Sequence, residues 1–155
     1  MKMNRFSVRL FFASIARRIR VSLLLFRGYD IKYSTIIEKG VRLDKLNPNG
    51  IHIGAHTLVA GGAVILSHEH CKRIKDNQPY ITNTSIGKNC FIGINAIILP
   101  GVVIGDEVIV GAGAIVTKNV PSKCVVAGNP AKIIRTGISM NEYAALIQWS
   151  ESAHS

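Results

Sequence analysis

The most regular stretch of the chain runs from Ile86 to Pro121 and repeats with a period of six residues. Divided into sixes, it reads IGKNCF, IGINAI, ILPGVV, IGDEVI, VGAGAI and VTKNVP. The first position of every unit is Ile or Val, the second is often Gly, and the fifth is small or β-branched. Repeats of fixed period indicate a solenoid, because each unit can bury its apolar residue only against its neighbours.

The period of six also predicts which kind of solenoid forms. An α-helix would space its apolar residues three and four apart, and an isolated strand would space them two apart. Units of six that combine Val or Ile with a glycine favour short strands separated by tight corners. Three units then complete one triangular coil, with the first-position aliphatics stacked inside it. We therefore predict a mainly β fold, a left-handed parallel β-helix, which is an exception to the usual right-handed crossover rule.

The same period is weaker between Tyr29 and Leu66, a stretch that we expect to form the first coils. The sequence NPNG, which begins at Asn47, predicts a turn or bulge within it. Asn47 itself occupies one slot of the repeat. The apolar positions that keep one phase of six here are Val41, Ile53, Val59 and Ile65.

The two halves of the repeat are out of phase with each other. Ile65 and Ile86 are 21 residues apart, which is not a multiple of six. The polar, non-periodic segment 67–85 is therefore predicted to be an insertion that projects as a loop from one corner of a coil. Long loops on a rigid scaffold frequently carry function.

Helices are predicted at both ends of the solenoid. Between Arg5 and Arg27, apolar residues recur three and four apart with arginines between them, which is typical of an amphipathic helix. This segment is too short and too charged to span a membrane, and no signal-peptide cleavage site follows it. Two interpretations stay open: the helix lies on an anionic membrane surface, or it packs against the end of the solenoid or a neighbouring subunit. At the other end, Ser139–Trp149 is predicted to form a short capping helix.

The chain is thus expected to divide into three parts. Residues 1–28 form a basic amphipathic helical segment, and residues 29–137 form the β-helix with its inserted loop 67–85. Residues 138–155 form the C-terminal helix and tail. At 155 residues the whole chain has the size of about one domain.

Charge and cysteine content narrow the expected partners. The net charge is +10, and residues 1–29 hold seven basic residues and no acidic one. Nucleic acid is not an expected partner, because these arginines alternate with bulky aliphatics and no nucleic-acid-binding motif is present. The three cysteines show neither a CxxC spacing nor a paired framework. This favours a cytoplasmic protein, located at the inner face of the membrane if the basic helix attaches there.

His68 and His70 are the candidate catalytic residues, because they lie at the start of the inserted loop. A neutral imidazole there can take a proton from a hydroxyl at neutral pH, as a general base does. Zinc would need three or four convergent ligands, and no histidine occurs between Cys71 and Ala153. No metal site is therefore predicted. The alternative is that both histidines are exposed loop residues without a chemical role.

The run from Phe91 to Arg135 resembles the hexapeptide-repeat acetyltransferases related to galactoside, maltose and Nod-factor acetyltransferases. The blocks GAGAIVTK and AGNPAKIIR carry the resemblance, which is strongest to the O-acetyltransferases of bacterial surface-polysaccharide synthesis and covers roughly Gly50 to Arg135. It implies a homotrimer with active sites between subunits. It also implies acetyl transfer from acetyl-CoA to a hydroxyl of a sugar or glycan precursor.

The resemblance also implies roles for individual residues. His68 corresponds to the catalytic base, with His70 as the alternative, and the backbone N–H groups near Gly93 and Ile94 would bind the oxyanion. Glu69 is expected to point away, so a backbone carbonyl or a Glu from elsewhere must orient the imidazole. Transfer is expected to be direct, without an acyl-enzyme at Cys71. The residues that correspond to coenzyme A contacts are Ala112, Thr117, Lys118, Lys132 and Arg135.

The acceptor is the least determined part of the prediction. Asp44, Asn47 and Asn49 are polar residues of the early coils that could bind sugar hydroxyls, and none is singled out. N-acetylation of an amino sugar or an antibiotic stays open as the enzymatic alternative. A repeat scaffold that binds a membrane or a protein partner through its basic helix is the non-enzymatic alternative.

Overall fold

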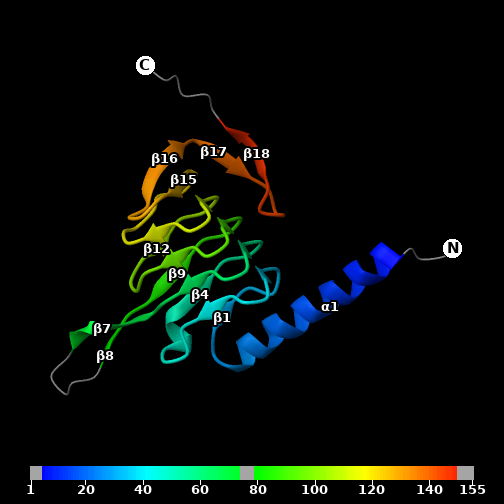
Figure 1. The fold of residues 1–155 in the computed structure, drawn as a ribbon, viewed down its shortest axis with the longest axis horizontal. Coiled ribbons are helices and arrows are strands. Elements are labelled where there is room, and N and C mark those ends of the chain that lie inside the picture. The colour runs from blue at the N-terminus through cyan, green and yellow to red at the C-terminus, as the bar shows by residue number, and fades with distance from the viewer. Residues whose placement is uncertain (1–4, 74–78, 150–155) are drawn as a thin grey trace.

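The structure, a computed structural model, describes residues 5–73 and 79–149, with the side chains of residues 5–13, 72–79 and 149 left aside. Within these residues the chain winds into a β-helix with three sheets, in which the strands of successive coils run parallel (Figure 1). The first sheet contains β1 (Asp30–Ile31), β4 (Ile51–Ile53), β9 (Thr84–Ile86) and β12 (Val103–Ile104). The second contains β2 (Ile36–Ile37), β5 (Leu58–Val59), β10 (Phe91–Ile92), β13 (Ile109–Val110), β15 (Cys124–Ala127) and β16 (Lys132–Thr136). The third contains β3 (Arg42–Leu43), β6 (Val64–Ile65), β11 (Ile97–Ile98) and β14 (Ile115–Val116).

The predicted period of six is confirmed between Ile86 and Pro121. Phe91 pairs with Ile109 and Ile97 with Ile115, so each pair is separated by one coil of three units. All first-position aliphatics of these units are at most 3% exposed, and the small fifth-position residues are also buried. The buried first-position residues are Ile86, Ile92, Ile98, Ile104, Val110 and Val116. This column of stacked aliphatics is the hydrophobic core.

The phase predicted for the first coil is wrong by two residues. Leu43, not Val41, pairs with Ile65 and points into the core, while Val41 is only partly buried at its edge. The reason is a short 3-10 helix, η1 (Pro48–Gly50), at the NPNG sequence, where the predicted turn adds residues between two coils. Leu43 and Ile65 are therefore 22 residues apart instead of the 18 that separate equivalent residues of the regular coils.

The predicted N-terminal helix is confirmed as α1 (Arg5–Phe26), and its C-terminal part packs against the first coil. Val21 is 1% exposed and belongs to the same core as the aliphatic column. Arg20 Nη1 donates a hydrogen bond of 2.7 Å to the carbonyl oxygen of Ile37. The helix thus covers the open end of the solenoid, where unpaired core residues would otherwise meet water. No helix of the described residues is long and apolar enough to cross a membrane.

The inserted segment projects from the solenoid as a two-stranded arm (Figure 1). Strands β7 (His68–Arg73) and β8 (Pro79–Ile81) pair in antiparallel fashion, and the coil resumes at Thr84. The prediction of a projection from one corner is confirmed. Its form is more regular than the loop that the sequence predicted.

The predicted C-terminal helix over Ser139–Trp149 is wrong, because this segment forms a β-hairpin. Strands β17 (Ile138–Met140) and β18 (Leu146–Trp149) are antiparallel. Ile138 and Met140 are buried on either side of the less buried Ser139, which is the period of two of a strand. The Asn141 side chain accepts hydrogen bonds from the backbone N–H groups of Tyr143 and Ala145, which closes the turn.

Candidate active site

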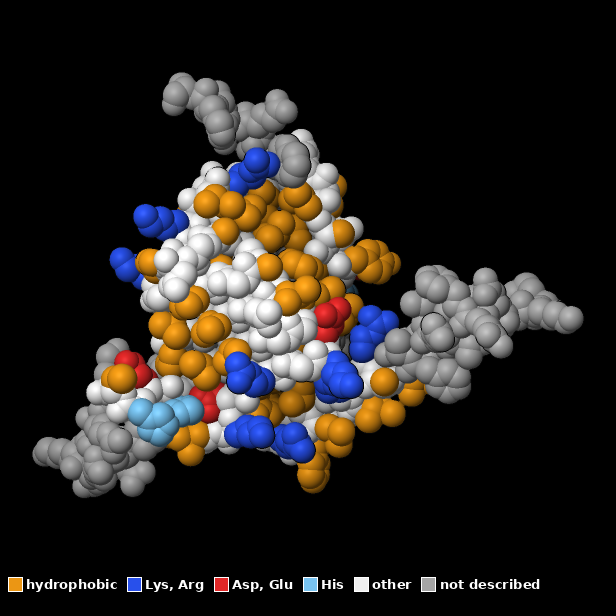
Figure 2. All heavy atoms as spheres, viewed as in Figure 1, with side chains coloured by type: hydrophobic (Ala, Val, Ile, Leu, Met, Phe, Trp, Pro, Cys, Tyr) orange, Lys and Arg blue, Asp and Glu red, His pale blue; other side chains and the backbone are white. Residues whose placement is uncertain are grey.

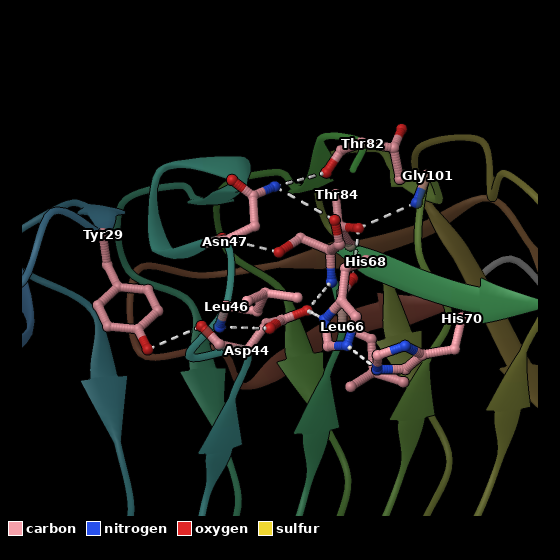
Figure 3. A network of polar contacts seen from close by, with 11 residues as sticks. Tyr29, Asp44, Leu46, Asn47, Leu66, His68, His70, Thr82, Thr84 and Gly101 are labelled. Atoms are coloured by element: carbon pink, nitrogen blue, oxygen red, sulfur yellow. Dashed lines mark hydrogen bonds and ion pairs between the residues drawn. The ribbon is translucent and has the colours of Figure 1, made fainter. Parts of the chain in front are cut away.

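The Asp44 carboxylate connects the first coil to the base of the arm and orients the His68 ring. It follows β3 and is almost completely buried, with 1% of its side chain exposed. Its Oδ2 atom accepts a hydrogen bond from the backbone N–H of Ser67 (2.8 Å) and a short one from His68 Nδ1. Its Oδ1 atom accepts from the backbone N–H of Leu46 (2.9 Å). Figure 3 shows these contacts converging on the one side chain.

The surroundings of Asp44 favour its ionised form. Burial raises the pKa of this carboxyl, but the hydrogen bonds from Ser67, His68 and Leu46 together lower it more, so the net pKa lies below its ordinary value. An ionised carboxylate can only accept hydrogen bonds. His68 Nδ1 therefore carries a proton, and the lone pair of the neutral ring is on Nε2. In this tautomer the nitrogen that faces away from Asp44 has a free lone pair, as a general base requires.

His70 lies beside the Nε2 atom of His68. Their two Nε2 atoms are 3.1 Å apart, and the rings meet edge to face with centroids 4.8 Å apart (Figure 3). Because His68 Nε2 is the acceptor in this pair, His70 Nε2 donates. His70 is exposed, and only His68 of the two contacts Asp44. The HxH sequence left open which of the two histidines is the candidate base. The contact with Asp44, a residue of another coil, distinguishes His68 from His70.

A second set of hydrogen bonds fixes the base of the arm. Asn47 Nδ2 donates to the carbonyl oxygens of Ser67 and Thr82, both at 3.2 Å, and so joins the outgoing and returning chains. Ser67 Oγ donates to the Asn47 carbonyl (2.7 Å) and Thr84 Oγ1 to that of Leu66 (2.6 Å). Asp44 and Asn47, predicted as candidates for sugar binding, instead form the internal framework of the site. Asn49, the third candidate, is exposed.

A groove of about 1220 Å³ opens beside the two histidines, between α1 and the first two coils. Its walls include apolar residues of the helix and of the coils. Arginine and lysine side chains line the same space. In Figure 2, the histidine side chains lie beside the arm, and basic side chains gather between them and the helix.

The residues matched to coenzyme A contacts occupy stacked corners of the solenoid. Gly93, Ile94 and Ala112 lie where the chain passes from the second sheet to the third, and Gly113 N donates to Ile94 O (2.8 Å). A Cβ atom on Gly93 would lie 2.6 Å from the backbone nitrogen of Ala112, so only glycine fits there. Ile94 is 56% exposed.

The remaining residues of this set lie on other parts of the last coils. Thr117 and Lys118 follow β14, at the corner between the third and first sheets. Lys132 and Arg135 lie on β16, which pairs with β15 at the end of the second sheet. All four are exposed.

One chain does not bring His68 next to Gly93 and Ile94. His68 comes just after β6, whereas Ile94 comes just before β11, the neighbouring strand of the same parallel sheet. Strands of this sheet run in one direction, so the two residues lie at opposite ends of it. Within a single chain, the candidate base and the candidate oxyanion donors are therefore on different corners.

The described residues contain no cluster of three or more His, Cys, Asp or Glu side chains that could hold a metal ion. Cys71 is exposed, while Cys90 and Cys124 are buried. Burial raises the pKa of the Cys90 thiol to about 11. Cys90 is thus a core residue of the repeat, as its fifth-position place predicts.

A β-helix built from units of six defines the class of hexapeptide-repeat proteins. Residues 83–118 match the family described as the hexapeptide repeat of succinyl-transferase. The chain is 31% identical over 137 residues to the putative colanic acid biosynthesis acetyltransferase WcaF of Escherichia coli K12, covering 84% of this chain and 72% of that protein. The chain belongs to the hexapeptide-repeat acetyltransferase family.

Two further comparisons agree with this assignment. The chain is 39% identical over 99 residues to the putative acetyltransferase YvoF of Bacillus subtilis 168, covering 64% of this chain and 55% of that protein. It therefore spans about half the length of that relative. The crystal structure of a maltose O-acetyltransferase from Clostridium difficile 630 superposes with a TM-score of 0.60 at 27% identity, over 76% of this chain and 74% of that one.

Proposed function

We propose that this protein transfers an acetyl group from acetyl-CoA directly to a hydroxyl of a sugar or glycan precursor, with His68 as the general base. The observation that carries this proposal is the buried Asp44 carboxylate on His68 Nδ1, at the edge of an open groove. It fixes the lone pair on Nε2 and stabilises the imidazolium that forms when the ring takes a proton.

Acetyl transfer to the acceptor hydroxyl needs no covalent enzyme intermediate. The acceptor oxygen bonds to the thioester carbonyl carbon as its proton passes to His68 Nε2. The C–S bond then breaks, and the proton moves to the leaving sulfur to give the free thiol of coenzyme A. His70 Nε2 must give way to the acceptor hydroxyl, because both compete for the same lone pair of His68.

The test of this role is the rate of coenzyme A release from acetyl-CoA with a panel of saccharides. His68→Ala is expected to lower kcat by roughly 10²–10⁴-fold, the usual contribution of a general base. His70→Ala is expected to cost less than about tenfold. Single and double variants that keep the wild-type rate, with unchanged circular dichroism, would refute the assignment. Amino sugars in the panel decide between O- and N-acetylation, and a folded protein that releases no coenzyme A with any acceptor would favour the scaffold alternative.

We infer that acetyl-CoA lies along the corners of the last coils. Backbone groups at Gly93, Ile94, Ala112 and Thr117 would contact the pantetheine arm. Lys118, Lys132 and Arg135 would pair with its phosphates, because charge-assisted hydrogen bonds to phosphate are the strong ones. Lys132→Gln should weaken coenzyme A binding in calorimetry several-fold more than Lys88→Gln, an exposed lysine on another corner. Equal effects would argue against this placement.

We propose a homotrimer in which each site combines His68 of one subunit with the Gly93–Ile94 corner of the next. The separation of these residues within one chain supports this arrangement, because a single subunit holds only half of the chemistry. Sedimentation velocity measures the assembly directly. Mixing His68→Ala subunits with Lys132→Glu/Arg135→Glu subunits should restore activity if sites are shared, and would leave the mixture inactive if they are not.

The outer face of α1 supports a further proposal, contact with an anionic membrane surface. Ile19, Leu23 and Phe26 lie on successive turns of the helix and are 55%, 54% and 91% exposed. The surrounding residues 1–29 carry seven basic and no acidic residues, which complements anionic lipid. The catalytic groove would then work at the inner, cytoplasmic face of the membrane.

Co-sedimentation with vesicles tests the membrane contact. The wild type should bind phosphatidylglycerol vesicles and not phosphatidylcholine vesicles, and Leu23→Gln/Phe26→Gln should release it. The surface-exposed Tyr143→Gln serves as the control. If the double variant changes the sedimentation coefficient and leaves vesicle binding unchanged, the face is a contact between subunits instead.

A further inference from the structure

The groove beside the histidines has a strongly positive lining. Arg20 and Arg27 enter it from α1 and the residue after it, and Arg42 and Lys45 enter it from β3 and the following corner. Among the described residues that line it, Asp44 is the one carboxylate. Both Asp44 oxygens already accept hydrogen bonds from His68 and from the backbone, so this acid does not neutralise the four cations.

None of these cations finds an acidic partner in the described part of the chain. Asp30 pairs with Lys32 and His52 instead, and Asp44 pairs with His68. Arg20 is held in place by its hydrogen bond to the Ile37 carbonyl, which accounts for one of its five N–H groups. Like charges that converge from two separate elements repel each other, and a bound anion would relieve that repulsion.

The groove is also suited to a ligand larger than one sugar ring. Its volume of about 1220 Å³ exceeds the roughly 300–1,000 Å³ of most small-molecule sites. Apolar side chains line the groove together with the cations. These are Leu24, Val41, Leu46, Pro48, Val64 and Leu66.

We propose that the acceptor is a phosphorylated saccharide, whose phosphate is held by Arg20, Arg27, Arg42 and Lys45 while its hydroxyl meets His68. This proposal rests on the proposed function, because it names the substrate class of the same site. Four cations are more than a ligand with a single carboxylate would need. An arginine guanidinium can donate two parallel hydrogen bonds to one phosphate. The apolar residues would contact the group esterified to the phosphate. That group can belong to a soluble nucleotide or to a lipid carrier.

Calorimetric titration tests the site without requiring acetyl transfer. The probes are glucose 1-phosphate, UDP-glucose and farnesyl diphosphate, with methyl α-glucoside as the neutral control. At low salt, glucose 1-phosphate should bind at least roughly tenfold more tightly than methyl α-glucoside, and added salt should reduce the difference. Tighter binding of UDP-glucose than of farnesyl diphosphate points to a soluble acceptor, and the reverse points to a lipid-linked one.

A matched pair of variants locates the binding. Arg42→Gln/Lys45→Gln should remove most of the preference for the phosphorylated sugar. Lys88→Gln/Lys123→Gln removes the same number of charges at exposed corners between the first and second sheets, and should leave it unchanged. Equal binding of neutral and phosphorylated sugars, or equal loss in both double variants, would overturn the proposal.

Two further measurements, coenzyme A binding and acetyl transfer, distinguish this proposal from a donor-phosphate site and from the proposed function itself. If Arg42→Gln/Lys45→Gln weakens coenzyme A as much as glucose 1-phosphate, the groove holds the phosphates of the donor and the proposal fails. If the phosphorylated sugar binds as expected while no acetyl transfer occurs with any acceptor, the site stands and the proposed function fails. If transfer proceeds equally well to neutral and phosphorylated sugars, the function stands and the acceptor class is wrong.

Discussion

The two halves of the solenoid differ in regularity and in what they contribute. From Ile86 to Pro121 every coil repeats the one before it, and the inward positions form an unbroken aliphatic column. Before Ile86 the repeat is interrupted twice, by the 3-10 helix Pro48–Gly50 and by the arm that begins at His68. Both interruptions meet at the candidate site, where Asn47 hydrogen-bonds both ends of the arm, at Ser67 and Thr82.

The difference shows how a repeat protein can acquire a unique site. A coil that is identical to its neighbours offers the same groups at each level, so no level is chemically distinct. The extra residues before β4 bring Asn47 to the base of the arm, and the arm in turn positions His68 on Asp44. The regular half supplies rigidity, and the irregular half supplies the special environment. Substitutions in the two halves should accordingly change different properties.

The largest effect is expected on the stability of the regular half. Ile98→Ala removes a fully buried side chain from the centre of the column and should lower the free energy of unfolding by about 2–5 kcal/mol. Urea unfolding followed by circular dichroism measures this. Ile134→Ala, at a position that is 65% exposed, should change it by less than about 0.5 kcal/mol. A similar, small change in both variants would contradict the assignment of the column as the core.

The next effect is expected on catalysis in the irregular half. Asp44→Asn should lower kcat by roughly 10²–10⁴-fold, comparable to the loss of His68, because an amide nitrogen facing Nδ1 would select the wrong tautomer of the imidazole. The KM for acetyl-CoA should change little, since the Asp44 carboxylate contacts His68 and the backbone of Leu46 and Ser67 and none of the residues assigned to coenzyme A. A variant with wild-type kcat would show that the carboxylate does not support the base.

The stabilising effect of Asp44 should also depend on pH. Because its pKa is lowered in the folded protein, its contribution is complete above the ordinary carboxyl pKa of 3.8 and is lost as the pH falls through the lower folded value. The difference in unfolding free energy between wild type and Asp44→Asn should therefore decrease as the pH falls below 3.8. Urea titrations at several pH values test this, with Glu142→Gln as the exposed control. A difference that grows as the pH falls below 3.8 would reverse the assigned sign.

A smaller change is expected for the framework at the base of the arm. Asn47→Ala removes the two side-chain hydrogen bonds to Ser67 and Thr82 and should cost about 1–2 kcal/mol of stability. Its activity should fall by more than this stability loss accounts for, because the arm that carries His68 loses its attachment. If the fully folded variant has the wild-type kcat, these hydrogen bonds stabilise the arm without supporting catalysis.

The smallest effect is expected at the cysteines. Native labelling with iodoacetamide should modify Cys71 first, because Cys90 and Cys124 are buried and burial raises the Cys90 pKa to about 11. Mass spectrometry of the labelled protein identifies the site. Cys71→Ser should retain the transfer rate within about twofold, since direct transfer needs no thiol nucleophile. A large loss of rate would instead indicate an acyl-enzyme.

The sequence predicted best where neighbouring units repeat. The period of six placed every inward aliphatic between Ile86 and Val116 correctly, and the break of 21 residues placed the arm and its two histidines. It failed at Val41, because the number of residues that η1 adds cannot be counted from the pattern alone. It also failed at the C-terminus, where the apolar spacing suited a helix and the Asn141 turn with the buried Ile138 and Met140 selected a hairpin.

The sequence by itself therefore determined the solenoid and the position of the candidate base, because both depend on local spacing along the chain. Only the tertiary structure decided that Asp44 supports His68, since these residues are 24 positions apart and meet through the stacking of two unequal coils. The same holds for the groove, whose cations come from a helix and a strand that become neighbours only when the helix covers the end of the solenoid. Contacts between coils depend on register, and register depends on the whole chain between them.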